Sequence, residues 1–383
     1  MLQQSPLHER YLSLGPAELA DRVARRKEEL GQALCILGHH YQSDEIVAVS
    51  DHVGDSLKLS QLAASSKQAR FIVFCGVHFM AESAAVLSGD DQAVCLPNLF
   101  AGCSMADMAD ATDVQAAIEE LCSRSGQSVV PVTYVNSTAA VKAVTARAGG
   151  ACCTSSNVRN VFEWALRAVT QGGAGAGKVL AIPDQHLGRN TAVAMGYSTQ
   201  DCAVYDPLQP GGGLSDDDLR RAAFLLWKGH CYVHQVFRPE HVGNVRRRHP
   251  GISVIVHPEC PHEVVQLADA SGSTEQIIRA VSDGPSGGKW AVGTESNLVN
   301  RLARRFGDRF VRILSEVPSF CAMMARVDLA HLLWVLDSLA EGKVVNRITV
   351  APDIAADARK ALDRMLAIGP VAQATPTKAA RTR

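Results

Sequence analysis

Short runs of β-branched and aliphatic residues alternate along this chain with stretches whose apolar positions recur at helical spacing. Runs of the first kind are typical of buried strands, and their alternation with amphipathic helices is typical of α/β units with parallel sheets. The pattern predicts strands in residues 33–41, 69–77, 128–136, 178–184, 252–260 and 289–295, and helices in residues 55–66, 137–148, 160–171, 263–270 and 274–281.

The predicted elements repeat three times. One strand ends in polar residues at His39–Tyr41, another at Tyr134–Asn136 and a third at His257–Glu259. Each of these ends is followed by a helical stretch, by a polar turn that opens another helix, and by a further strand. The polar turns are residues 54–56, 154–157 and 272–274. The chain is therefore predicted to contain three copies of a strand–helix–strand–helix–strand unit.

These copies predict three similar three-layer α/β domains with parallel sheets. The first covers residues 25–103, and the C-terminal segment 322–370 is expected to pack on it. The second covers residues 104–230, the third covers residues 231–321, and residues 371–383 are expected to form a frayed tail because their hydrophobicity is low. Since ligands bind beyond the carboxyl ends of parallel strands, the polar strand ends and turns are expected to face one ligand site.

The polar turns have an ordinary alternative, because Ser and Thr are common helix N-caps. Three caps in register, each paired with a polar strand end, favour a binding site in which the N–H groups at helix starts bind an anion. The formal net charge of −1 creates no general attraction to nucleic acid or membrane. No apolar run is long enough to span a bilayer, and the charged, proline-containing start does not resemble a signal peptide, so a cytoplasmic location is expected.

The chain has eleven cysteines, and no export signal is recognised at its start, which argues against a disulfide scaffold. The absence of a CxxC pair argues against a zinc ribbon and a ferredoxin-type electron carrier. Cys103, Cys231 and Cys321 lie near the joints between the copies, one for each copy. A pseudo-threefold arrangement would bring their thiolates together, and three thiolates on a [4Fe–4S] cluster leave one iron open to a substrate oxygen. The other cysteines are expected to pack as small apolar residues, although Cys260 follows Glu259 and could also be a ligand.

Many stretches of the chain resemble the quinolinate synthase (NadA) family. They occur in family order from about residue 36 to residue 336 and include HHYQSDEI, VGDSLKLSQLA, LPNLFAGCSMAD, TYVNSTAAVKA, PDQHLGRNTA, GHCYVHQVF, HPECPHEVVQLAD and FCAMMARVDL. The resemblance implies three similar α/β domains in a pseudo-threefold triangular arrangement around a central [4Fe–4S] cluster. It also implies that Cys103, Cys231 and Cys321 are the ligands of that cluster.

The resemblance further implies a reaction of NAD biosynthesis. Iminoaspartate condenses with dihydroxyacetone phosphate to give quinolinate, phosphate and two waters, and the open iron of the cluster acts as a Lewis acid. Iminoaspartate is supplied by L-aspartate oxidase, which is the implied functional partner.

Site residues follow from the matching motifs and from residue type. Glu259 and Tyr41 are the candidates for acid/base steps, because phosphate loss and two dehydrations require proton transfer near neutral pH. His234, three positions after Cys231, is expected to position the phosphate or the ring-closing intermediate. The expected substrate-binding residues are His39, Ser56, Tyr134, Asn136, Ser155, His257, Ser273 and Thr274.

Other interpretations stay open. His234 could pack beside a cluster, Tyr41 could be a core aromatic residue, and His186 and Arg189 are interpreted as structural. The chain has His40 where the family often has Tyr, and it lacks the CxxCxxC run that some members have at the last ligand.

Two rival functions compete with the family reaction. A zinc or mononuclear-iron lyase could use His257, Cys260 and His262, but a turn with two prolines is poorly shaped for tetrahedral ligation. A non-catalytic sensor of the same dicarboxylate would need an output module, and the sequence contains no recognisable one.

Overall fold

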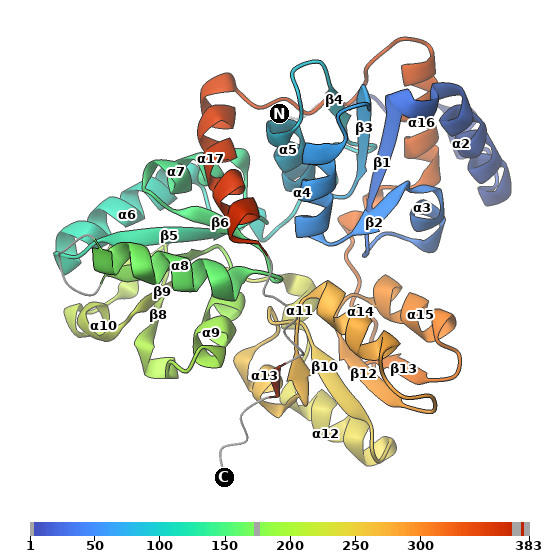
Figure 1. The fold of residues 1–383 in the computed structure, drawn as a ribbon. Coiled ribbons are helices and arrows are strands. Elements are labelled where there is room, and N and C mark those ends of the chain that lie inside the picture. The colour runs from blue at the N-terminus through green and yellow to red at the C-terminus, as the bar shows by residue number, and fades with distance from the viewer. Residues whose placement is uncertain (1–3, 172–176, 370–376, 379–383) are drawn as a thin grey trace. The chain divides into compact units, whose positions relative to one another are not determined.

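The structure, a computed structural model, describes residues 4–171, 177–369 and 377–378 and contains three sheets flanked by helices (Figure 1). The chain divides into two compact units. The first comprises the chain up to Cys103 together with Cys321–Pro352, and the second comprises Ser104–Phe320 and the chain from Asp353 onward.

The first unit holds one parallel four-stranded sheet in the order β2-β1-β3-β4. Its long helix α2 packs on α16, and the Arg26 guanidinium donates to the Asp337 carboxylate at 2.6 Å. The strands are β1 (Leu34–His39), β2 (His52–Gly54), β3 (Phe71–Cys75) and β4 (Ala93–Cys95), and the helices are α1 (Glu9–Leu12), α2 (Pro16–Leu30), α3 (Asp44–Val49), α4 (Ser56–Ser65), α5 (His78–Leu87) and α16 (Leu329–Ala340).

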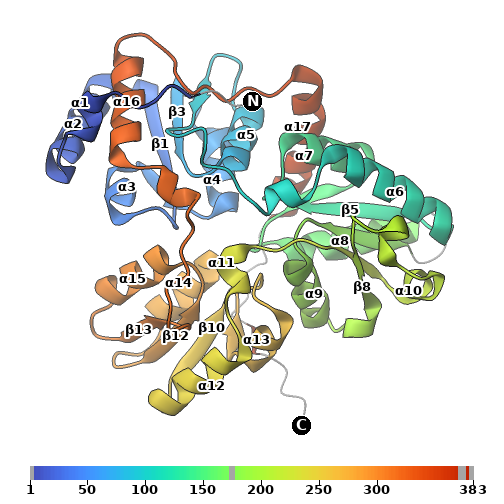
Figure 2. The same ribbon diagram turned by 180° about the vertical axis from the view of Figure 1, so that it is seen from behind.

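The second unit begins with a parallel five-stranded sheet in the order β6-β5-β7-β9-β8. Helices α6, α7 and α10 contribute apolar side chains to the core on one face of this sheet, while α8 and α9 lie on the other face (Figures 1 and 2). The strands are β5 (Val129–Tyr134), β6 (Ala151–Cys153), β7 (Lys178–Ile182), β8 (Cys202–Tyr205) and β9 (Phe224–Trp227), and the helices are α6 (Ala111–Ser125), α7 (Ala139–Arg147), α8 (Val158–Gln171), α9 (Gln185–Ala194) and α10 (Asp216–Arg221).

A third sheet, in the order β13-β12-β10-β11-β14, completes the second unit. Its strands are parallel except β14, and the core on one face is formed by Val254 and Val256 of β10 with Val242 and Val245 of α12. The strands are β10 (Ser253–Val256), β11 (Ala270–Ser271), β12 (Lys289–Gly293), β13 (Phe310–Ile313) and β14 (Thr377–Lys378), and the helices are α11 (Tyr232–Gln235), α12 (Pro239–Arg248), α13 (His262–Leu267), α14 (Thr274–Ser282) and α15 (Ser296–Arg305).

The α/β fold class with parallel sheets is confirmed, and so are the six predicted strands and five predicted helices. In all three sheets the first strand lies between the second and the third, in the order β2-β1-β3, β6-β5-β7 and β11-β10-β12. In each sheet the first and third strands are paired up to one last residue pair. These last pairs are Gly38–Cys75, Thr133–Ile182 and Val256–Gly293. His39, Tyr134 and His257 follow these pairs and therefore occupy equivalent positions.

The expectation that the whole segment 322–370 packs on the first domain is wrong for helix α17 (Pro352–Ile368), which belongs to the second unit. The Arg364 guanidinium donates to the Gly150 carbonyl at 2.5 Å, and Arg147 pairs with Asp357 at 2.8 Å. The segment therefore divides, with α16 on the first unit and α17 on the second. Of the expected tail, 371–376 and 379–383 lie outside the described residues.

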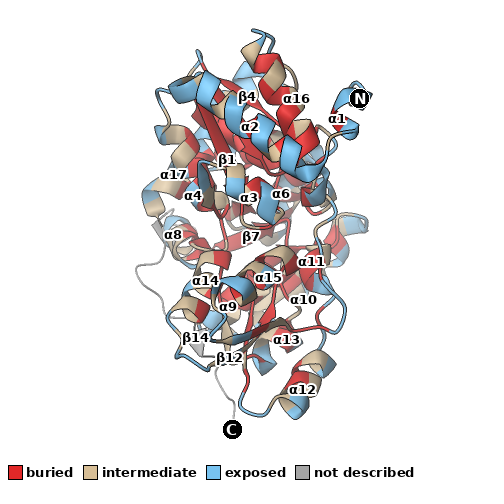
Figure 3. Cartoon of the chain, turned by 90° about the vertical axis from the view of Figure 1, so that its right-hand side faces the viewer, coloured by how far each residue is buried: buried red, intermediate tan, exposed pale blue. Residues whose placement is uncertain are grey.

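Strands β1, β3, β5, β7 and β9 are buried at all or all but one of their positions, whereas α2 carries a row of exposed residues (Figure 3). This pattern is the one expected of a sheet covered on its faces by amphipathic helices. Within the described residues, no helix is both long enough and apolar enough to cross a bilayer.

The division of the C-terminal segment predicts local effects of two matched core substitutions. Leu362 of α17 and Leu336 of α16 are both fully buried. Leu362→Ala should cost about 2–5 kcal/mol and speed amide hydrogen exchange in α7 and β6. Leu336→Ala should have a similar cost but should speed exchange in α2 instead. Equal protection of α7 and β6 in both variants would contradict the assignment of α17 to the second unit.

Candidate functional site

The histidines that follow β1 and β10 form the same local turn. The Nδ1 atom of His39 accepts from the N–H of Tyr41 at 3.1 Å, and Nδ1 of His257 accepts from the N–H of Glu259 at 3.4 Å. Each histidine carbonyl also accepts from the N–H three residues further on, at 3.0 Å in both turns. Because Nδ1 acts as an acceptor, the neutral ring carries its proton on Nε2 and can donate from that atom.

The residue two positions further on is also equivalent in the three domains. These positions hold Tyr41, Asn136 and Glu259, all predicted as site residues. The Tyr41 ring lies edge-on to the His39 ring, with 4.7 Å between ring centroids. The buried Oδ1 atom of Asn136 has no hydrogen-bond partner among the described residues. A buried amide oxygen without a partner is costly unless a ligand supplies the donor.

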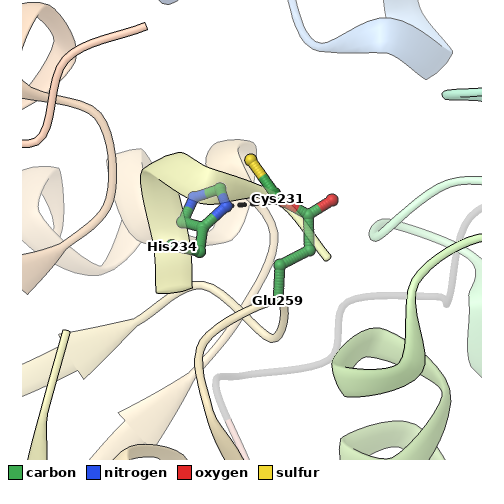
Figure 4. Close-up of side chains that lie close together, drawn as sticks. All are labelled: Cys231, His234 and Glu259. Carbon is green, nitrogen blue, oxygen red and sulfur yellow. Dashed lines mark ion pairs between the residues drawn. The ribbon is translucent and has the colours of Figure 1, made fainter. Parts of the chain in front are cut away.

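Cys231, His234 and Glu259 form a compact group in the second unit (Figure 4). Cys231 and His234 belong to the turn around α11, and Glu259 lies in the turn after β10. One ligand atom from each residue lies within 4.8 Å of the others. The Nδ1 atom of His234 lies 2.6 Å from Glu259 Oε2, the contact drawn as a dashed line in Figure 4.

Neighbouring side chains fix the ring of His234. It stacks on the ring of His257, with 4.4 Å between centroids and an interplanar angle of 14°. Its Nε2 atom lies 3.1 Å from the hydroxyl oxygen of Thr294. Both ring nitrogens of His234 therefore face an oxygen atom, Nδ1 that of Glu259 and Nε2 that of Thr294.

The carboxyl groups of Glu259 and Asp184 are buried, and their pKa values move in opposite directions. Burial alone raises the pKa of Glu259, but His257 and His234, with hydrogen bonds from His234 and Tyr134, lower it to about 2. Burial and the charge of Glu259 raise the pKa of Asp184 well above its usual value. Glu259 is therefore the ionised member of the pair, and burial together with the Glu259 charge disfavours ionisation of Asp184.

Asp184 is a site residue that the sequence interpretation missed. Its Oδ1 accepts the Leu187 N–H at 2.7 Å as the N-cap of α9, and it also accepts a hydrogen bond from the backbone of Cys231. Its second oxygen, Oδ2, is buried without a hydrogen-bond partner among the described residues. The available signal was the Asp that follows a predicted strand and opens a helix.

The polar turns differ in how they use their hydroxyl groups. Ser273 caps α14, and its Oγ accepts the Gln276 N–H at 3.4 Å, so the ordinary N-cap role holds for this residue. In the first domain Asp55 caps α4, and Ser56 is the first helical residue. Thr274 likewise opens α14, and Ser155 lies in the turn before α8. The hydroxyl groups of Ser56 and Thr274 are therefore not the caps of their helices.

The three cysteines predicted as ligands share one local structure. Cys103, Cys231 and Cys321 stand eight residues before the helices that begin at Ala111, Pro239 and Leu329. A single helical turn lies between each cysteine and its helix: η2 (Ala106–Met108), α11, or η5 (Met324–Arg326). The threefold repeat therefore extends from the sheets to the cysteines at their joints.

Exposure separates these cysteines from most of the others. None of the eleven cysteines is in a disulfide, and Cys103, Cys231 and Cys321 are partly exposed. Burial raises the pKa of the Cys75, Cys95 and Cys152 thiols to about 12 and that of Cys202 to about 11, and it also raises the pKa values of Cys35, Cys153 and Cys260. Such thiols resist forming the thiolates that ligate metals. The remaining cysteine, Cys122, lies on α6 and packs against the core.

Comparisons with known proteins give the family. The NadA family, described as "Quinolinate synthetase A protein", matches residues 21–367. A relative from Acidobacterium capsulatum, named quinolinate synthase, is 51% identical over 362 residues, which are 94% of this chain and 95% of the relative. Relatives of the same name from Streptomyces coelicolor and Geobacillus kaustophilus are 52% and 50% identical, over 92% and 94% of this chain and 88% and 96% of their own lengths. The chain belongs to the NadA family of quinolinate synthetase A proteins.

Proposed function

We propose that this chain is a quinolinate synthase that condenses iminoaspartate with dihydroxyacetone phosphate to give quinolinate, phosphate and two waters. The observation that carries the proposal is the buried group of Glu259, His234 and His257 beside Cys231, in a chain of this family. L-aspartate oxidase would supply iminoaspartate, and the reaction would take place in the cytoplasm.

We propose Cys103, Cys231 and Cys321 as ligands of a [4Fe–4S] cluster around which the three domains form a triangle. The donor chemistry supports this assignment, because these thiols are partly exposed at equivalent joints while seven others have raised pKa values. When bound, the cluster supplies an iron without a protein ligand, which acts as a Lewis acid toward a substrate oxygen.

The chain's own residues would bind a dicarboxylate with hydrogen-bond donors. In this proposal His39 and His257 donate from Nε2, because Nδ1 of each ring already accepts a backbone N–H. The substrate carbonyl and hydroxyl oxygens lie near Tyr134 and Asn136. The hydroxyl groups of Ser56, Ser155, Ser273 and Thr274 add donors at the polar turns.

We assign the main acid/base role to Glu259. Its Oε1 atom is buried and has no hydrogen-bond partner among the described residues, so it can accept a proton from a substrate atom. The low pKa of Glu259 makes it a weak base, but a bound dicarboxylate adds negative charge and raises that pKa toward neutrality. His234 holds the carboxylate in place, and Tyr41 serves a second proton transfer.

A mononuclear-metal lyase is the second candidate, because Cys231, His234 and Glu259 offer sulfur, nitrogen and oxygen ligands within 4.8 Å of one another. Acid-labile sulfide separates the two candidates, since a mononuclear metal site contains none.

The cluster assignment is tested by anaerobic reconstitution with iron and sulfide. The wild type should bind about four irons with acid-labile sulfide and make quinolinate, whereas Cys321→Ala should lose the cluster and the activity. Cys122→Ala, which changes a partly exposed cysteine on α6, is the matched control and should keep both. A wild type that makes quinolinate without sulfide would overturn the cluster proposal.

The role of Glu259 is tested by Glu259→Gln, which keeps the shape of the side chain and removes its charge. The variant should keep its iron content while kcat falls by about 10²–10⁴-fold. Glu263→Gln, an exposed change on the neighbouring helix, should leave kcat unchanged. A Glu259→Gln enzyme with wild-type kcat would rule out the acid/base assignment.

The neutral state of His257 is tested by stability at different pH values. Burial and His234 lower the pKa of His257 from 6.5 to about 3. Between these values the unfolded chain binds a proton that the folded chain does not, so wild-type stability should fall as the pH decreases from 6.5. His257→Gln should remove up to about 1.4 kcal/mol per pH unit of this slope, measured by denaturant unfolding. Identical slopes would show that His257 is protonated in the folded state.

A further inference from the structure

We propose that Asn190 is a positioning residue that holds Glu259 in its reactive place. Asn190 lies on α9, in the domain built on the β5–β9 sheet, and is 5% exposed. Its side chain contacts the turn after β10, in the next domain along the chain, and this turn carries Glu259. The inference rests on the acid/base role proposed for Glu259.

Asn190 donates to both sides of Glu259 in the chain. Its Nδ2 atom lies 2.8 Å from the carbonyl oxygen of Pro258 and 2.9 Å from that of Cys260. These carbonyls are the acceptors of the residues immediately before and after Glu259. One carboxamide therefore fixes the two residues that flank the candidate acid/base.

The third contact sets the orientation of the amide. Carbonyl oxygens only accept, so the atom that faces Pro258 and Cys260 must be the NH2 group, and Oδ1 faces His262. Oδ1 lies 2.7 Å from Nδ1 of His262, which must therefore carry the proton. Both N–H bonds and the carbonyl oxygen of Asn190 are thus engaged, which is the arrangement expected of a rigid buried amide.

The Glu259 turn depends on this support because β10 ends before it, at Val256. Within the turn, the Cys260 N–H donates to the His257 carbonyl at 3.0 Å. The contact that matters lies at the far end of the side chain, where Oε2 of Glu259 is 2.6 Å from Nδ1 of His234. A shift of about 1 Å in the turn would break that contact, and misplacement of this size costs up to about 100-fold in rate.

A matched amide in the first unit provides a control. The Nε2 atom of Gln92 donates to the carbonyls of Ser66 and Ala69 at 2.7 and 2.5 Å, and its Oε1 accepts the Gly89 N–H at 2.8 Å. It is 6% exposed, close to the value for Asn190, and none of its partners is a site residue. Gln92→Ala therefore measures the loss of a buried amide with two carbonyl partners, without an effect on Glu259.

The experiment is a double-mutant cycle of Asn190→Ala and Glu259→Gln in the reconstituted holoenzyme, with kcat, KM and iron content as readouts. Asn190→Ala alone should lower kcat by about 10–100-fold, with iron content unchanged and KM within about twofold. In the Glu259→Gln background it should lower kcat by less than about twofold, because the residue through which it acts is already disabled. Gln92→Ala should lower Tm by about as much as Asn190→Ala does, because both remove a buried amide, and it should leave kcat unchanged.

A second variant keeps the test decisive if Asn190→Ala does not fold. His262→Phe removes only the donor to Asn190 Oδ1 and should lower kcat by about three- to tenfold, again without a further effect in the Glu259→Gln background. Losses that multiply with that of Glu259→Gln, or a wild-type kcat in both the Asn190 and His262 variants, would overturn the inference while Glu259 stays catalytic. A wild-type kcat in Glu259→Gln alone would instead overturn the proposed role of Glu259, and the inference with it.

Discussion

The Glu259 carboxylate lies 2.6 Å from Nδ1 of His234 and is 2% exposed. A buried anion is strongly unfavourable unless charges and hydrogen bonds compensate for the water that it has lost. His234 and His257 stack beside this carboxylate, and Tyr134 donates to it from the end of β5. The carboxylate of Glu259 therefore interacts with residues from the end of β5, the end of β10 and α11, all in the second unit.

Burial and the same charge raise the pKa of Asp184. Two buried carboxylates close together disfavour each other's ionisation, and the one with the histidine partners has the lowered pKa. Asp184 also accepts from the backbone of Cys231, so the candidate cluster ligand and the candidate acid/base share one hydrogen-bonded region. A change of charge at Glu259 is therefore expected to reach the backbone of Cys231 through Asp184.

The sequence predicted well what depends on local periodicity. The six strands and five helices were predictable because each has an apolar run or stripe of its own, and His39, Tyr134 and His257 were found because polar residues end those runs. Strands β2, β6 and β11 have only two or three residues, too few to show a period of two. The side on which α17 packs was not predictable, because an amphipathic stripe shows that a helix is covered but not by which sheet.

Contacts between residues far apart in the chain also could not be predicted from the sequence. Asn190 and Pro258 are 68 positions apart, and no local pattern distinguishes a buried amide from an exposed one on an amphipathic helix. The cysteines are an intermediate case, since their placement near the joints, one for each copy, was visible in the sequence, but the helix that begins eight residues after each of them was not. Two of them, Cys103 and Cys321, are the residues at which the chain leaves and re-enters the first unit. Cys231 lies within the second unit instead, in the turn that also carries His234, so the local structure shared by the three cysteines does not depend on where the chain passes between the units.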